Sequence, residues 1–166
     1  MSEPDDPRRL GPVAVALLAL APVVAAAVIG NLATIPNLAP WYAGLVKPSF
    51  NPPNGVFGPV WTLLYLMMVA AFWRVLRLDR ATPGRRAAIG WFLTQMVLNA
   101  SWSVAFFGLR SPLVGVVVIG WLLVAIGATI RAFAPLDRLA AGLLVPYLAW
   151  VSFAAVLNTA VWALNR

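Results

Sequence analysis

Residues 41–65 read WYAGLVKPSFNPPNGVFGPVWTLLY, a proline- and aromatic-rich connection that leads straight into an apolar segment. Six prolines lie from Pro36 to Pro59, and this stretch carries one charged side chain, Lys47. Because proline fixes the backbone torsion φ and restricts the residue before it, the connection should be stiff. We therefore expect a rigid lid over a pocket for a flat, apolar molecule. The predicted lid residues are Trp41, Lys47, Pro48, Pro52 and Pro53.

Long apolar segments account for most of the rest of the chain. Of its 166 residues, 62% are hydrophobic and 10% are charged, and a membrane span needs about 20 consecutive apolar residues. The predicted spans are 12–33, 57–73, 87–107, 113–134 and 139–164. Because the backbone must satisfy its own hydrogen bonds in lipid, we predict an all-α membrane protein, a five-transmembrane-helix bundle with a proline-rich lid loop between helices 1 and 2. Residues 10–166 should form this single domain, behind a flexible polar tail at 1–9.

The basic residues indicate how the bundle is oriented. The net charge is +7, but the basic side chains gather at the ends of the spans and not along one soluble face, so no nucleic-acid partner is expected. Nine of them lie in the tail, the second loop and the fourth loop, whereas the opposite side holds Lys47, Arg110 and Arg166. The positive-inside rule then predicts a multi-pass integral membrane protein with a cytoplasmic N-terminus and an extracytoplasmic lid loop.

Missing residue types exclude several kinds of chemistry. The sequence contains no cysteine and no histidine. This excludes disulfides, thiolate nucleophiles, histidine general bases, histidine-containing zinc sites and the commonest haem ligand. No acidic residue lies inside a predicted span, which argues against ion-coupled transport. We expect no metal site and no required cofactor, and binding of an apolar molecule remains as the function.

Aromatic side chains recur at helical spacing in three spans, which places them on one face of each helix. The second span has the series Trp61, Tyr65, Met68 and Phe72. The third has Trp91, Gln95, Asn99, Trp102 and Phe106. The fifth has Tyr147, Trp150, Ala154 and Asn158. Rings with a few isolated amides are typical of a small-molecule site, so the three faces predict one aromatic cage.

Structural roles compete with binding for some of these residues. Trp41, Trp73 and Trp162 lie near span ends, where tryptophan commonly marks the membrane interface, although Trp41 also opens the lid. Trp121 is expected to face lipid or a neighbouring helix. Gln95 and Asn99 are equally well explained as hydrogen-bonding links between helices.

Small residues and turn signals complete the prediction. Gly115, Gly120, Gly127 and Ala128 are expected to permit close helix packing. The pair Pro83-Gly84 predicts a turn, residues 108–112 a tight turn, and Asp137 the cap of the fifth span.

Several blocks of residues resemble one family. Residues 41–49 read Trp-Tyr-x-x-Leu-x-Lys-Pro-Ser, and Pro52-Pro53 is followed at 58–65 by Gly-Pro-Val-Trp-x-x-Leu-Tyr. Further blocks are Gln-x-x-Leu-Asn-x-x-Trp at 95–102, Phe-Phe-Gly at 106–108, Pro-Tyr-Leu-Ala-Trp at 146–150 and Leu-Asn at 157–158. In this order they resemble the TspO/MBR family, the translocator proteins or tryptophan-rich sensory proteins.

The resemblance implies a five-helix membrane protein, often a homodimer, whose first loop covers a pocket between helices. It implies binding of tetrapyrroles such as protoporphyrin IX and haem, and a sensory or regulatory role in porphyrin or stress metabolism. The implied ligand-binding residues are Tyr42, Trp61, Tyr65, Asn99, Trp102, Trp150, Ala154, Leu157 and Asn158. Tyr42 and Trp150 also match positions linked to light-dependent porphyrin breakdown.

The sequence departs from the family pattern at several positions. Phe50, Gly55 and Val114 stand where relatives often have tryptophan, which leaves the affinity for drugs open. Thr159 stands where the sterol motif of mitochondrial relatives needs tyrosine, so sterol binding is not expected.

Three functions therefore compete. The first is a receptor or carrier for tetrapyrroles, which suit stacking on aromatic rings. The second is an enzyme that degrades porphyrin in light, with the pigment supplying the reactivity. The third is a regulator whose lid opens and closes with ligand.

Overall fold

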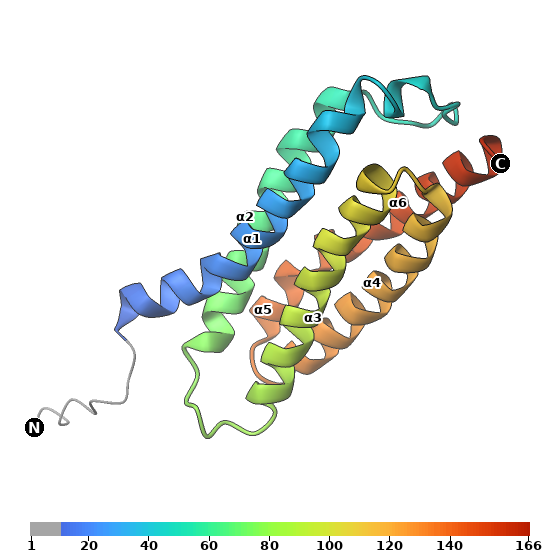
Figure 1. The fold of residues 1–166 in the computed structure, drawn as a ribbon. Helices are drawn as coiled ribbons and strands as arrows, with labels where there is room; N and C mark the ends of the chain where they lie inside the picture. Colours follow the sequence, from blue (N-terminus) through green and yellow to red (C-terminus); the bar gives the residue numbers. More distant parts are fainter. Residues whose placement is uncertain (1–10) are drawn as a thin grey trace, which may run out of the picture.

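The computed structural model describes residues 11–166 and is helical throughout, with no strand in that part of the chain (Figure 1). The helices are α1 (Pro12–Leu38), α2 (Asn54–Leu76), α3 (Arg85–Ser103), α4 (Pro112–Phe133), α5 (Arg138–Leu143) and α6 (Val145–Leu164). A 3₁₀ turn, η1 (Tyr42–Gly44), and a π turn, η2 (Val104–Gly108), lie between them. The all-α prediction is confirmed. The predicted polar tail, 1–9, lies outside the described residues.

Four helical segments are long and apolar enough to cross a membrane: α1, α2, α4, and α5 together with α6. The fifth, α3, is less apolar because it begins with Arg85 and Arg86 and carries Gln95 and Asn99. The arrangement is that of a multi-pass integral membrane protein, and it is consistent with five crossings.

The least apolar of the long helices, α3, turns its polar side chains toward the interior of the bundle. α3 packs against α1, α2 and α4, and α6 packs against α4. Gln95 and Asn99 are both buried. This placement follows from the lack of water in a bilayer, where polar side chains turn toward the bundle interior.

The first helix runs five residues past its predicted end at residue 33. Pro36 lies inside its last turn, where the loss of one backbone hydrogen bond does not stop the helix. Arg110 Nε donates to Asn37 Oδ1 at 3.0 Å and ties this end of α1 to the α3–α4 turn. α1 also bends in its N-terminal half (Figure 1), where the second internal proline, Pro22, lies.

The tight turn predicted at 108–112 is confirmed, but the helix before it is not regular. The last turn of the third span widens into η2, with Leu109 N donating to Val104 O at 2.8 Å. Arg110 then adopts a positive φ of 52°, and the Ser111 hydroxyl accepts from Val114 N to cap α4. The π turn therefore sets the orientation of the two phenylalanines inside it.

The fifth span, predicted as one helix over 139–164, is divided at Leu144 into α5 and α6. Pro146 has no N–H and cannot donate to the carbonyl of Gly142, so the regular hydrogen-bonding series stops there. A tighter bond, from Leu144 N to Ala141 O at 3.1 Å, closes α5.

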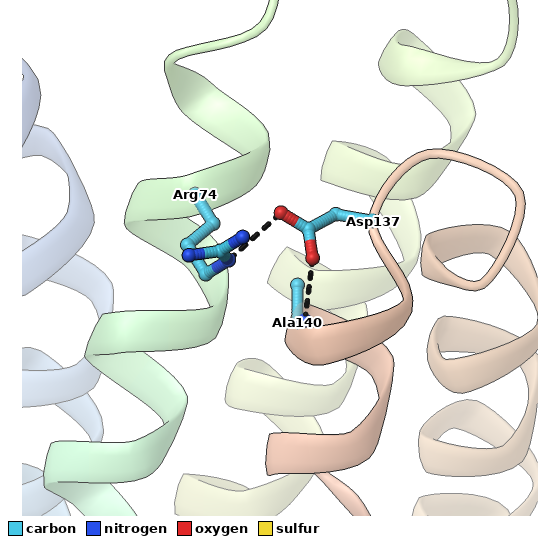
Figure 2. A network of polar contacts seen from close by, with 3 residues as sticks. All are labelled: Arg74, Asp137 and Ala140. Carbon is cyan, nitrogen blue, oxygen red and sulfur yellow. Dashed lines mark hydrogen bonds and ion pairs between the residues drawn. The ribbon is translucent and has the colours of Figure 1, made fainter.

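Asp137 caps α5, as predicted, and also pairs with α2 (Figure 2). Its Oδ1 accepts from Ala140 N at 2.9 Å, and its Oδ2 accepts from Arg74 Nε at 2.7 Å. Burial acts to raise the pKa of Asp137, but the Ala140 N–H and the Arg74 guanidinium outweigh it and hold the pKa below its ordinary value. One carboxylate thus fastens α2 to the start of α5.

Aromatic and basic residues occupy the helix ends. Arg77 lies over the Trp73 ring at 4.6 Å, and Arg166 lies over Trp162 at 5.7 Å. Trp121 is 63% exposed on the outer face of α4. These positions agree with interface roles for Trp73 and Trp162 and with a lipid-facing Trp121.

Replacing Asp137 by alanine should destabilise the bundle by about 0.5–2 kcal/mol, the usual cost of losing a helix cap. Asp137→Asn keeps the cap acceptor and should lose less. Because the folded-state pKa is lowered, the contribution of the carboxylate is complete above its unfolded pKa and is lost as the pH falls through the folded value. Thermal unfolding in detergent between pH 7 and pH 3 measures this. An Asp137→Asn protein with the same pH dependence as the unchanged one would contradict the assignment.

Candidate functional site

A hydrogen-bonded chain of three side chains joins α2, α3 and α6. The Tyr65 hydroxyl donates to Asn99 Oδ1 at 3.1 Å, and Asn99 Nδ2 donates to the Tyr147 hydroxyl at 2.8 Å. Asn99 and Tyr147 are 3% and 0% exposed. Asn99 therefore links helices as well as facing the predicted cage.

A second polar chain lies nearer the α1–α2 loop. Trp102 Nε1 donates to Asn158 Oδ1 at 3.0 Å, and Asn158 Nδ2 donates to the Pro112 carbonyl at 2.8 Å. Pro112 is the first residue of α4, so its carbonyl is held by α6 from the side. Gly115 makes room for this arrangement, because a Cβ there would lie 2.7 Å from Asn158 Oδ1.

Aromatic rings bridge α2 and α6 around the hydrogen-bonded series of Tyr65, Asn99 and Tyr147. The Trp61 ring lies 5.3 Å from Tyr65 and 6.2 Å from Tyr147, measured between centroids. One turn toward the loop, Phe57 meets Trp150 at 5.9 Å. Ring faces and edges at such distances attract one another, so these two helices meet through rings.

The α1–α2 loop, residues 39–53, lies against the end of the third span. Tyr42 is buried, and its ring packs on Phe106 and Phe107 at 6.3 and 5.5 Å. Its hydroxyl donates to Asn51 Oδ1 at 3.3 Å, and Lys47 Nζ lies 4.6 Å from its ring centroid. Burial raises the pKa of the Tyr42 phenol, with the Asn51 bond offsetting part of the rise.

The other residues predicted in the loop have different surroundings. Trp41 contacts Phe106 and Phe107 by its ring edge. Pro48 and Pro52 are half-buried, and Pro53 is exposed at the position before α2. The loop is thus held by its aromatic residues and stiffened by its prolines.

Asn165, just beyond α6, holds the loop from the other end of the chain. Val46 N donates to Asn165 Oδ1 at 3.0 Å, and Asn165 Nδ2 donates to Val46 O at 2.9 Å. Asn165 Nδ2 also donates to Val161 O of α6. This pair of hydrogen bonds joins residues that are 119 apart in sequence. Helical spacing does not predict it.

The structure brings the predicted site residues into two adjoining groups. Trp61, Tyr65, Trp150 and Ala154 pack on the main core, whereas Tyr42 and Leu157 belong to a smaller cluster toward the loop. Trp102 packs on both. The polar members Asn99 and Asn158 lie in the two hydrogen-bonded chains described above.

Three sequence-based interpretations need correction. Trp91, predicted on the inner face of α3, is 42% exposed, because the buried face of α3 passes through Ala88 and Phe92 at that level. Gly120 and Gly127 do not serve close packing within the described residues, since a Cβ at either would meet no atom within 4 Å. Gln95 is buried but forms no link between helices: its amide has no hydrogen-bond partner among the described residues.

Three phenylalanines of the site were missed: Phe57, Phe107 and Phe153. Phe57 lies four residues before Trp61, and Phe153 lies three after Trp150, so helical spacing alone indicates them. Phe107 contacts Tyr42 beside the predicted Phe106, and this pair of contacts depends on the π turn, which has no such signal.

The surface hollows lie elsewhere. One of about 460 Å³ is formed by the α2–α3 loop, and another of about 540 Å³ lies on the outer face of α1. Neither is lined by a residue of the aromatic site. In this structure the rings and amides of the site contact one another.

Comparison with known proteins decides the family. The profile of the TspO/MBR family matches residues 18–163. The chain belongs to the TspO/MBR family. It is 46% identical over 131 residues to the tryptophan-rich protein TspO of Chlorobaculum tepidum, covering 78% of this chain and 83% of that protein.

Two further TspO/MBR relatives come from distant organisms. The human translocator protein is 42% identical over 134 residues, covering 76% of this chain and 75% of its own. The tryptophan-rich sensory protein of Cereibacter sphaeroides is 40% identical over 127 residues, covering 75% and 77%. These relatives support a membrane receptor or sensory role for this TspO/MBR protein.

Gly115→Ala should disrupt the second polar chain of this TspO/MBR protein, because the new methyl group would lie 2.7 Å from Asn158 Oδ1 and 3.1 Å from Phe106. We expect destabilisation of about 1–3 kcal/mol, as for other overpacked cores. Gly120→Ala is the matched control on the same helix and should be neutral or stabilising by about 0.5–1 kcal/mol. Unfolding midpoints of the two variants in detergent test this, and equal midpoints would contradict it.

Proposed function

We propose that this protein is a membrane receptor or carrier that binds tetrapyrroles such as protoporphyrin IX and haem between α2, α3 and α6, beneath the α1–α2 loop as a lid. The observation that supports the proposal is the convergence of rings from three helices and the loop around two buried amides, Asn99 and Asn158. The predicted sensory or regulatory role in porphyrin metabolism follows from the same site.

The chemistry of a porphyrin suits these residues. Its flat π-system would stack between rings such as Trp61 and Trp150, which now fill the space between α2 and α6. The amides of Asn99 and Asn158 can hydrogen-bond to pyrrole or carboxyl groups. Lys47, beside Tyr42 in the loop, carries a positive charge that a propionate would attract.

The orientation and assembly belong to the same proposal. The α1–α2 loop would face the extracytoplasmic side and the arginine-rich α2–α3 loop the cytoplasm. The two loops lie at opposite ends of the bundle, as this orientation requires (Figure 1). We propose a homodimer on the basis of the family, and no sterol site, because Thr159 is exposed and lacks the ring of the sterol motif.

Binding should show in a porphyrin titration of the purified protein in detergent, followed by the shift of the porphyrin absorption band. Trp61→Leu removes a ring that contacts Tyr65 and Tyr147 and should weaken porphyrin binding about tenfold. The stacking of a nucleic-acid base on one aromatic side chain is worth about 1–3 kcal/mol, and we expect a similar contribution for a porphyrin. Trp121→Leu, on the outer face of α4, should bind as the unchanged protein does.

Haem provides a second comparison in the same titration. The sequence has no histidine, and Met68 is packed in the core, so iron ligation should add little and haem should bind about as tightly as the metal-free porphyrin. Equal affinity of Trp61→Leu and Trp121→Leu would contradict the location of the site. A strong preference for iron with a low-spin spectrum would contradict stacking as the basis of binding.

The alternative function, light-dependent porphyrin breakdown, is favoured by the position of Trp150. Its ring is half-buried between Phe57 and Phe153, where it would lie beside the pigment and could be oxidised by it. Tyr42 is the second candidate. The protein would position the pigment while the pigment carries the reactivity.

Under this alternative, Trp150→Phe should bind porphyrin normally but no longer accelerate its photobleaching, because phenylalanine keeps the ring and loses the oxidisable indole. The measurement is the loss of the porphyrin band under illumination at equal occupancy. Trp121→Phe is the control and should bleach the pigment like the unchanged protein. Equal bleaching by Trp150→Phe would exclude this tryptophan from the reaction.

A further inference from the structure

Gln95 carries a fully buried side-chain amide that makes no hydrogen bond within the part of the chain that the structure describes. Its side chain is 0% exposed, and neither Nε2 nor Oε1 has a hydrogen-bond partner among the described residues. It lies in the middle of α3, which is enclosed by α1, α2 and α4.

An unpaired amide in this position is costly. Leaving a buried donor or acceptor unsatisfied destabilises the folded protein, and methionine has almost the same shape without that cost. By contrast, the other two buried amides of the cage, those of Asn99 and Asn158, are each bonded at both ends. We therefore expect a second state of the protein, with ligand bound, in which the Gln95 amide forms a hydrogen bond.

Helix geometry points to a group that could pair with it. Gln95 and Asn99 are four residues apart on α3, so their side chains lie one above the other on the same face. Asn99 donates to the hydroxyl of Tyr147 at 2.8 Å. Because side chains on a helix lean toward its N-terminus, the Asn99 amide and the Tyr147 hydroxyl bonded to it are directed toward the turn that holds Gln95.

Occupation of the cage would disturb this bond. Asn99 uses its oxygen for Tyr65 and its nitrogen for Tyr147, so a ligand that takes the place of either hydroxyl on Asn99 leaves that hydroxyl without this bond. Tyr147 is 0% exposed, and a displaced hydroxyl would stay unsatisfied in the core of the bundle. Gln95 offers it both an acceptor and a donor.

We propose that Gln95 is a positioning residue that receives the Tyr147 hydroxyl when a ligand takes its place on Asn99. This inference rests on the function proposed above. It makes Gln95 a determinant of specificity: the exchange lowers the cost of binding for molecules that hydrogen-bond to Asn99, and contributes nothing for molecules that only stack.

The test compares Gln95→Met with the unchanged protein in two measurements. In the ligand-free protein, Gln95→Met should raise the unfolding midpoint by about 2–4 °C, since a 1 kcal/mol gain shifts a protein of this size by about that much. In the titration with protoporphyrin IX, the same variant should bind about tenfold more weakly, because the displaced hydroxyl finds no partner. Thr94→Val, on the exposed side of the same turn, should change neither.

Tyr147→Phe separates the exchange from direct contact. Without the hydroxyl there is nothing to transfer, so Gln95→Met should have no further effect on porphyrin affinity in the Tyr147→Phe background. A double-mutant cycle on the four proteins measures this coupling. A tenfold loss that persists in that background would mean that Gln95 contacts the ligand itself and would overturn the exchange.

The remaining outcomes are also decisive. A lower unfolding midpoint for ligand-free Gln95→Met would show that the amide already stabilises the resting protein, and would overturn the inference. Unchanged porphyrin affinity in Gln95→Met, with normal binding by the unchanged protein, would overturn it while leaving the proposed function intact. Failure of the unchanged protein to bind porphyrin would overturn both.

Discussion

The need to pair every buried polar group inside a bilayer governs this structure. Lipid tails are as apolar as the helix surfaces, so the hydrophobic effect gives helices little reason to associate. Two asparagines supply that reason: Asn99 joins α3 to α2 and α6, and Asn158 joins α6 to α3 and α4. Both lie on the helix faces that also carry the aromatic rings. The fold and the candidate site therefore depend on the same hydrogen bonds.

The two ends of the bundle are closed in different ways, and this difference locates the site. At the end near the α2–α3 loop, α2 packs on α5, and Arg74 pairs with the capping carboxylate of Asp137. Toward the α1–α2 loop, α2 and α6 meet through pairs of rings, and Asn165 fastens the loop across that end. Ring contacts can be exchanged for contacts with a flat ligand, whereas the ion pair of Arg74 and Asp137 cannot be replaced in this way. Ligand entry should therefore take place at the loop end.

Sequence patterns predicted whatever depends on helical periodicity or local capping. The apolar segments, the cap at Asp137 and the inward face that carries Asn99 follow from spacing of three and four residues. Features that arise from departures from regular helix could not be predicted, such as the break at Leu144 and the π turn that brings Phe106 and Phe107 to Tyr42. The packing of glycines depends on which neighbour faces them, so Gly115 and Gly120 look alike in sequence and differ in structure. The family resemblance supplied the site residues that periodicity left open.

A site whose amides are already paired selects its ligand by two criteria at once. A molecule that only stacks can replace ring contacts, but it would bury the Asn99 amide without offering it a better partner. A molecule that only hydrogen-bonds could satisfy Asn99, yet it would leave the rings of Trp61 and Trp150 without the contacts they now make. Only a ligand with a broad aromatic face and polar groups at its centre or edge replaces both sets of contacts. The unpaired amide of Gln95 would fit this requirement under the proposed exchange, because it would provide a partner for the hydroxyl that such a ligand releases.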